Sequence, residues 1–265
     1  MQPSLVFLGT GQGPEVVAKQ LRGSGGIVIR YGDNQLHIDP GPSSLRMAKM
    51  CDVSPRETSC ILVSHPHLNH CNDVNTCINS MTYGGLDKRG VLISTNQLIN
   101  GEGSAGPYLT DFHKQCLEKY MVLKESQRAA IDDIEIRATK TFHPIENIGF
   151  QILTPEFGIS YLSDTAYNEE LVEQHKDSEI LILNVTNPFS LRAETNLNSD
   201  DATRLIKQLK PRLAIISHFS IKMLQADPML EARDISKESG VQVIAANDGY
   251  SLNPSNYSVR KRQGR

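Results

Sequence analysis

The sequence predicts an α/β protein in which sheets and helices form a layered sandwich. Hairpin-like apolar segments dominate the first part of the chain, and strands alternate with amphipathic helices in the last part. The 265 residues are 39% hydrophobic and 22% charged, which is ordinary for a globular protein with a sizeable core. These observations favour a packed α/β fold over a repeat, a bundle or a disordered chain.

The first half of the chain predicts short strands and one clear helix. Val74, Ile78 and Met81 recur at helical spacing, so a helix is expected over residues 71–85. Glycine and polar residues fill the start of residues 100–115, which predicts a loop leading into a helix. The expected strands are 4–11, a hairpin over 26–41 that turns at 32–34, and 59–65.

The second half predicts longer strands and two amphipathic helices. One helix covers residues 199–210 with a serine or aspartate cap, and the other covers 229–240 and stops at Gly240. The expected strands are 134–144, a hairpin over 148–165 that turns at 155–158, then 178–186, 213–220 and a closing strand over 241–252.

Charge and cysteine content bear on the cellular compartment and the binding partners of the protein. A formal net charge of −3 gives no general attraction to nucleic acid or an anionic membrane, and no apolar run is long enough to span a bilayer. No signal-peptide pattern opens the sequence, and five cysteines without a CxxC pair suit a reducing compartment. We therefore expect a cytoplasmic protein, in which Cys71 and Cys77 are ordinary buried thiols.

Four apolar strands are followed by side chains that can bind a metal ion. A lone histidine after a strand is usually structural, but three histidines within six positions favour metal binding. Neutral imidazole suits zinc, and manganese or iron are possible, while a carboxylate can bridge two ions. The candidate ligands are His65, His67 and His70 in SHPHLNH, followed by His143, Asp164 and His218.

These motifs resemble the metallo-β-lactamase superfamily. SHPHLNH is similar to its HxHxDH signature, and FHP, LSDTA and ISHFS follow in the superfamily's order. The opening LGTGQG, the IDPGPSS segment with Asp39 and the closing ANDGY resemble its RNase-Z-like branch. The resemblance covers nearly the whole chain, so it implies one metallo-β-lactamase-fold domain over residues 1–265, a four-layer αβ/βα sandwich.

The resemblance also implies a site with one or two ions, and relatives of this kind are often homodimers. It implies that a metal-bound hydroxide attacks the substrate and that Asp39 orients a ligand histidine. By position, the first ion would be held by His65, His67 and His143, Asp164 would bridge, and the second would be held by His70, His218 and residue 69.

Two positions depart from the pattern of the family. Asn69 stands where the superfamily has an aspartate, and Asn196 stands where the RNase-Z-like branch often has a histidine that assists the leaving group. An amide is a weak ligand and no base, so both changes remove a group that can move protons. The metal ligands themselves are retained.

Three interpretations remain open. The protein is a working hydrolase in which another group, such as Asp73 or Asp200, compensates; or it binds metal but is catalytically weakened and acts as a binding module or partner subunit. The third is that Asn69 is a deliberate inactivating change. The retained set of candidate ligands favours the hydrolase.

The expected substrate is a small phosphodiester or another small ester or lactone. Only 20 residues separate His143 from Asp164, which leaves no room for the inserted tRNA-clamping arm of tRNA-processing relatives. The acidic balance also disfavours long nucleic acid. Residues 101–115 suit either a lid over the site or a plain surface loop.

Overall fold

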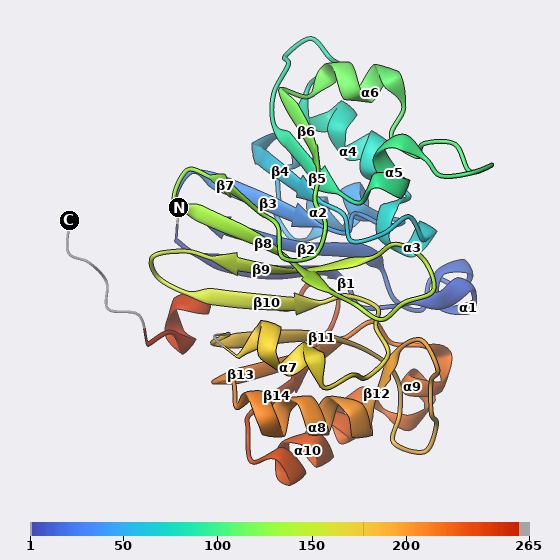
Figure 1. The fold of residues 1–265 in the computed structure, drawn as a ribbon, viewed down its shortest axis with the longest axis vertical. Coiled ribbons are helices and arrows are strands. Elements are labelled where there is room, and N and C mark those ends of the chain that lie inside the picture. The colour runs from blue at the N-terminus through green and yellow to red at the C-terminus, as the bar shows by residue number, and fades with distance from the viewer. Residues whose placement is uncertain (1, 177, 260–265) are drawn as a thin grey trace. The chain divides into compact units, whose positions relative to one another are not determined.

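The structure is a computed structural model that describes residues 2–176 and 178–259. These residues form two compact units. Unit 1 comprises residues 2–123 and 247–253, and unit 2 comprises the remainder. Each unit has its own mixed sheet and its own helices (Figure 1), which confirms the α/β class. That residues 1–265 form a single domain stays a prediction.

Unit 1 is built on a seven-stranded sheet in the order β15-β1-β2-β3-β4-β5-β6. The pairs β15–β1, β1–β2 and β2–β3 are antiparallel, and β3–β4, β4–β5 and β5–β6 are parallel. Its strands are β1 (Ser4–Gly9), β2 (Ser24–Tyr31), β3 (Asn34–Ile38), β4 (Thr58–Leu62), β5 (Val91–Ser94), β6 (Lys119–Val122) and β15 (Ser251–Leu252).

In the described part of unit 1, helices pack against this sheet. Apolar side chains of β4 and β5 meet those of α4 and α5 in one core cluster, and β1 and β2 meet α2 in another. The helices are α1 (Gly13–Ala18), α2 (Ser44–Met50), α3 (Leu68–Cys71), α4 (Val74–Met81), α5 (Asn96–Asn100) and α6 (Asp111–Cys116), with a 3-10 turn at Pro55–Glu57.

Unit 2 repeats this plan with the path β14-β13-β11-β10-β9-β8-β7, and β12 pairs with β11 beside it. The pairs β7–β8, β8–β9 and β9–β10 are antiparallel, and β10–β11, β11–β13 and β13–β14 are parallel. Its strands are β7 (Arg128–Ile131), β8 (Ile134–Lys140), β9 (Ile148–Leu153), β10 (Gly158–Leu162), β11 (Ile180–Asn187), β12 (Leu197–Asn198), β13 (Leu213–Ser217) and β14 (Val243–Ala245).

The helices of unit 2 bury one face of its sheet. Side chains of β11 and β13 pack against α8 and α10 in a single apolar cluster. The helices are α7 (Glu170–His175), α8 (Ser199–Leu209), α9 (Ile221–Ala226) and α10 (Pro228–Ser239), with a 3-10 turn at Pro254–Tyr257. Among all described residues, no helix is long and apolar enough to cross a membrane.

Most of the predicted elements are present, and three details were wrong. The N-cap of α8 is Asn198, not a serine or aspartate. Its side chain accepts a hydrogen bond from the Asp201 N–H, and the Asp201 carboxylate accepts one from the Asn198 N–H. Residues 241–252 are not one strand, because β14 and β15 belong to different sheets and a turn at 247–250 separates them. The helix expected over 71–85 is confined to α4, since Tyr83, Gly84 and Gly85 have positive φ.

Candidate metal ligands in the two units

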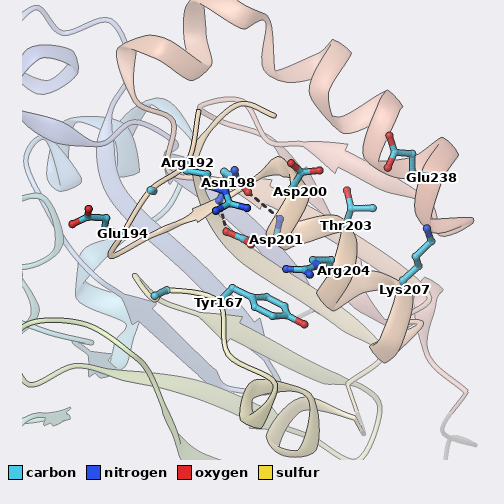
Figure 2. A pocket seen from close by; sticks show the side chains of 12 residues that line it. Tyr167, Arg192, Glu194, Asn198, Asp200, Asp201, Thr203, Arg204, Lys207 and Glu238 are labelled. Carbon is cyan, nitrogen blue, oxygen red and sulfur yellow. Dashed lines mark hydrogen bonds between the residues drawn. The ribbon is translucent and has the colours of Figure 1, made fainter. Parts of the chain in front are cut away.

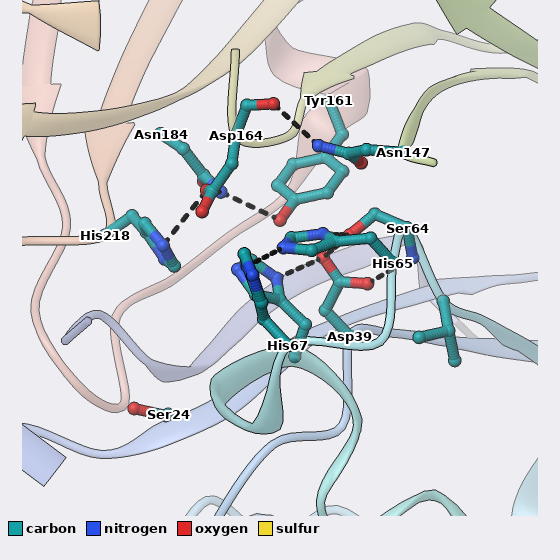
Figure 3. A network of polar contacts seen from close by, with 12 residues as sticks. Ser24, Asp39, Ser64, His65, His67, Asn147, Tyr161, Asp164, Asn184 and His218 are labelled. Atoms are coloured by element: carbon teal, nitrogen blue, oxygen red, sulfur yellow. Dashed lines mark hydrogen bonds and ion pairs between the residues drawn. The ribbon is translucent and has the colours of Figure 1, made fainter. Parts of the chain in front are cut away.

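The three histidines of SHPHLNH lie together in unit 1. His65 follows β4 and is fully buried, while His67 is the N-cap of α3 and His70 lies in its last turn. Nε2 of His65 is 2.8 Å from Nδ1 of His67, and the rings of His65 and His70 are 4.2 Å apart. The short loop after a rigid strand thus brings three imidazoles to one place, as Figure 3 shows for His65 and His67.

Asp39 sets the proton positions of two of these histidines. Its Oδ2 accepts from Oγ of Ser64 at 2.8 Å, so that hydroxyl is left to accept from Nδ1 of His65 at 2.9 Å. The same Oδ2 is 2.8 Å from Nδ1 of His70, and Oδ1 accepts from the backbone N–H of Ser64 at 2.7 Å. In both rings the proton belongs on Nδ1 and the lone pair on Nε2, the form in which a histidine binds metal.

Asn69 sits in α3, half-buried, between His67 and His70. Its backbone is fixed by a close approach from Gly41, where an added Cβ would lie 2.0 Å from the carbonyl oxygen of Asn69. Only glycine fits this contact, which holds α3 against the loop that follows Asp39. The position that carries an aspartate in the family signature is therefore rigidly placed, but it presents an amide.

In unit 2, Asp164 and His218 are already in contact. Nε2 of His218 lies 3.0 Å from Oδ1 of Asp164, and both side chains are buried. Nδ2 of Asn184 donates to the same Oδ1 at 2.8 Å and lies 3.2 Å from the Tyr161 hydroxyl (Figure 3). Nδ2 of Asn147 donates to the Asp164 backbone carbonyl at 2.6 Å. The carboxylate is thus fixed at both its main chain and its side chain.

His143 and Asn196 are connected through one loop of unit 2. His143 lies three residues beyond β8, half-buried, with Nδ1 3.2 Å from the carbonyl oxygen of Thr195. The next residue, Asn196, accepts from the Thr195 hydroxyl at 3.0 Å and is also half-buried. A carbonyl can only accept, so this contact again puts the His143 proton on Nδ1 and the lone pair on Nε2.

The candidate ligands thus form two preformed sets, one in each unit. Oδ2 of Asp73 accepts from the Ser44 N–H at the start of α2, and Asp200 is exposed on α8, so a compensating role for either stays a prediction. Cys71 and Cys77 are buried in the unit 1 core, as predicted. Burial raises the pKa of Cys71 to about 12 and that of Cys77 further, so both remain thiols.

Sequence reasoning missed the residues that hold these ligands from behind. Ser64, Asn184, Tyr161 and Asn147 carry no motif of their own. One signal was available for Asn184, because a polar side chain in the apolar run SEILILNVT must find a partner when it is buried.

The comparison with protein families identifies the fold. The family described as the beta-lactamase superfamily domain matches residues 34–219, which includes every candidate ligand. This chain belongs to that superfamily. Among curated relatives, the uncharacterized protein MJ1374 of Methanocaldococcus jannaschii is 32% identical over 256 residues, covering 95% of each chain. A ribonuclease Z of Salinispora arenicola is 26% identical over 156 residues, covering 57% of this chain and 48% of its own.

Solved structures agree on the metallo-β-lactamase fold. The metallo-beta-lactamase fold protein YhfI of Bacillus subtilis has a TM-score of 0.77 at 16% identity, covering 95% of this chain and 99% of its own. A diphosphatase from the PhnP family has a TM-score of 0.69 at 17% identity, covering 95% and 97%. The resemblance to this superfamily and its RNase-Z-like members is therefore confirmed, and solved structures similar to this chain include a metallo hydrolase of Ignicoccus hospitalis.

Proposed function

We propose that this protein is a metal-dependent hydrolase of a small phosphodiester or another small ester. The observation that carries the proposal is the bonding around Asp39, which puts the lone pairs of His65 and His70 on Nε2. Superfamily membership and the diphosphatase among the structural neighbours support the reaction class.

The donor set fits divalent metal ions. Three histidines in unit 1, and His143, Asp164 and His218 in unit 2, offer imidazole nitrogen and carboxylate oxygen, which are typical ligands of zinc. By analogy with the superfamily we assign His65, His67 and His143 to one ion, His70 and His218 to a second, and Asp164 to both. Such ions supply Lewis acidity that polarises a substrate oxygen and activates water at neutral pH.

The protein's own residues orient these donors. Asp39 holds His70 directly and His65 through Ser64, while Asn184 holds the Asp164 carboxylate. Because all these groups are buried and hydrogen-bonded before any ion binds, little reorganisation is needed on binding.

Asn69 and Asn196 favour a second candidate, a metal-binding protein with weak turnover. An amide at 69 adds no negative charge to the second ion and cannot accept a proton from water. The side chain of Asn196 likewise cannot protonate a leaving group. In this candidate function the protein binds the substrate-like ligand or a partner protein without rapid hydrolysis.

Metal content and turnover, measured together, separate the two candidates. Zinc per chain is determined by elemental analysis, beside hydrolysis of bis-p-nitrophenyl phosphate, for the natural chain and for Asn69→Asp. The hydrolase predicts two ions and turnover in the natural chain. If the natural chain binds one ion and shows no turnover, and Asn69→Asp gains both the second ion and turnover, the weakened site is established instead. If neither chain binds metal, both candidates fail.

The size of the change at residue 69 is itself a prediction. Asn69→Asp adds an anionic ligand and a proton acceptor, so we expect kcat to rise roughly 10²- to 10⁴-fold, as is typical of one acid–base group. The matched control is Asn72→Asp, an exposed position two residues beyond His70 that adds the same charge. A comparable rise in the control would show that general charge, not the ligand position, is responsible.

A further inference from the structure

Unit 2 contains a cavity of about 620 Å³ beside α8 (Figure 2). Its wall is formed by one side of α8, the loop around Arg192 and Glu194, Tyr167 and its neighbour Ala166, and Glu238 of α10. A volume of this size is typical of small-molecule sites. None of these residues is among the candidate metal ligands.

Tyr167 gives the cavity an aromatic wall that is already fixed in place. Its hydroxyl donates to Oε1 of Glu169 at 2.6 Å and accepts from Nε2 of Gln208 at 3.2 Å. The Arg204 guanidinium lies 5.0 Å from the ring centroid. Burial, together with Glu169, raises the pKa of Tyr167, so the hydroxyl stays protonated. A flat ring of a ligand can stack beside such a preorganised pair at little entropic cost.

Side chains of both charges line the cavity. Asp201 is used in the cap of α8, because its carboxylate accepts from the Asn198 N–H. Within the described part of the chain, no ion pair within 4.0 Å involves the other charged side chains of the wall, which are Arg192, Arg204, Lys207, Glu194, Asp200 and Glu238. Three cations and three carboxylates thus line one cavity without a close ion pair among them.

The wall of the cavity is hydrogen-bonded to the segment that carries His143. Ala166 N donates to the carbonyl of Phe142 at 2.8 Å, and His143 Nδ1 bonds to Thr195 O, one residue beyond Glu194. Asp164 lies three residues before Tyr167. A ligand in the cavity therefore contacts the same two segments that position two of the candidate ligands.

We infer that this cavity binds a nucleoside monophosphate group. The cations suit the phosphate, the carboxylates suit ribose hydroxyls or an exocyclic amine, and Tyr167 with Arg204 suits the base. Inorganic phosphate alone is a poor ligand, because the three carboxylates repel its charge and it has no ribose or base with which to contact them or Tyr167. Resting on the proposed function, the inference makes the substrate a nucleotidyl phosphodiester; the binding itself requires no metal.

Calorimetric titration of adenosine 5′-monophosphate into metal-stripped protein tests the inference. We expect one site per chain, at least tenfold weaker binding of inorganic phosphate, and about tenfold weaker nucleotide binding in Tyr167→Leu and in Arg204→Gln. Tyr167→Phe, which keeps the ring, should retain most of the affinity. Lys222→Gln on α9 removes an exposed cation that does not line the cavity and should bind as the natural protein does.

Three results would overturn the inference. They are no saturable nucleotide binding, equal affinity for inorganic phosphate and for the nucleotide, or unchanged nucleotide affinity in both Tyr167→Leu and Arg204→Gln. Circular dichroism of each variant confirms that it is folded. Because the titration contains no metal, its failure leaves the proposed hydrolase untouched. Conversely, nucleotide binding without any metal uptake would refute the hydrolase and leave the cavity assignment standing.

Discussion

The two units share one sheet plan but use their carboxylates differently. In each sheet three antiparallel pairs are followed by three parallel pairs, and the strand at the change is β3 in unit 1 and β10 in unit 2. Asp39 comes directly after β3, and Asp164 lies two residues after β10. The same place in the plan thus carries a buried carboxylate in both units.

The two carboxylates differ in the hydrogen-bond partners that the neighbouring strand places beside them. After β4, unit 1 supplies the Ser64 N–H and hydroxyl, and with His70 these occupy both oxygens of Asp39. In unit 2, β11 supplies only the Asn184 amide, which meets Oδ1 together with His218. Asp39 is therefore a positioning residue for histidines, whereas Asp164 as a metal ligand stays a prediction.

The largest expected loss of stability follows from removing the Asp39 carboxylate in unit 1. Asp39→Ala leaves the buried Ser64 N–H, its hydroxyl and the His70 ring without their acceptor, so we expect the free energy of unfolding to fall by about 3 kcal/mol. Urea denaturation measures the loss, and elemental analysis should show fewer ions per chain. Asp33→Asn, an exposed carboxylate in the preceding turn, is the control and should change neither.

A smaller effect is expected from the corresponding change in unit 2. Asn184→Ala removes the donor that fixes Oδ1 of Asp164, and such a partner of a ligand typically contributes 10- to 100-fold in metal affinity. We expect roughly tenfold weaker zinc binding by competition with a chelator, and a shift in the pH dependence of binding. Thr186→Val, two residues along β11, removes a buried hydroxyl that has no recorded hydrogen bond and should leave zinc affinity unchanged.

Equal losses in Asn184→Ala and Thr186→Val would contradict this role, because they would show only that β11 tolerates no change. Tyr161→Phe sharpens the test further. It removes the hydroxyl next to Asn184 but leaves the bond from Asn184 to Asp164, so its effect on zinc affinity should lie between those of the other two variants.

The sequence predicted most of the sheets because their apolar runs are long and bounded by turns. It also singled out the histidines of SHPHLNH as candidate ligands, because three histidines within six positions form a local pattern at the start of α3. The bonds among those side chains could not be predicted, because they join residues such as Asp39 and His70 that are 31 positions apart. Which motif residues bind metal remains a prediction.

Local cues failed where tertiary pairing decides the structure. The apolar start of residues 241–252 predicts one strand, but Ala246 N bonds to Ile216 in unit 2 whereas Gly249 N bonds to Phe7 in unit 1. The chain therefore changes sheets within four residues. Asn198 was passed over as a cap because serine and aspartate follow it directly, and all three types are good caps.

The smallest expected effect is on the pH dependence of stability, and it is tested with one buried histidine in each unit. Burial lowers the pKa of His175 in unit 2 to about 3, so it is neutral in the folded protein near pH 5.5, while an unfolded histidine with a pKa of 6.5 is largely protonated. The unfolded state then binds more protons, and stability falls as the pH drops from about 6.5 toward 3. At pH 5.5 this costs about 1.4 kcal/mol relative to pH 7.5.

His175→Gln should remove that acid-dependent loss, measured as the difference in unfolding free energy between pH 7.5 and 5.5. His37→Gln in unit 1 should remove less. Burial also lowers the pKa of His37, but the Gly25 carbonyl, at 2.7 Å from Nε2, and nearby Asp39 and Asp73 act in the opposite direction. Equal effects of the two variants would show that burial alone governs both histidines. No effect in either would place the acid sensitivity of the fold in its carboxylates instead.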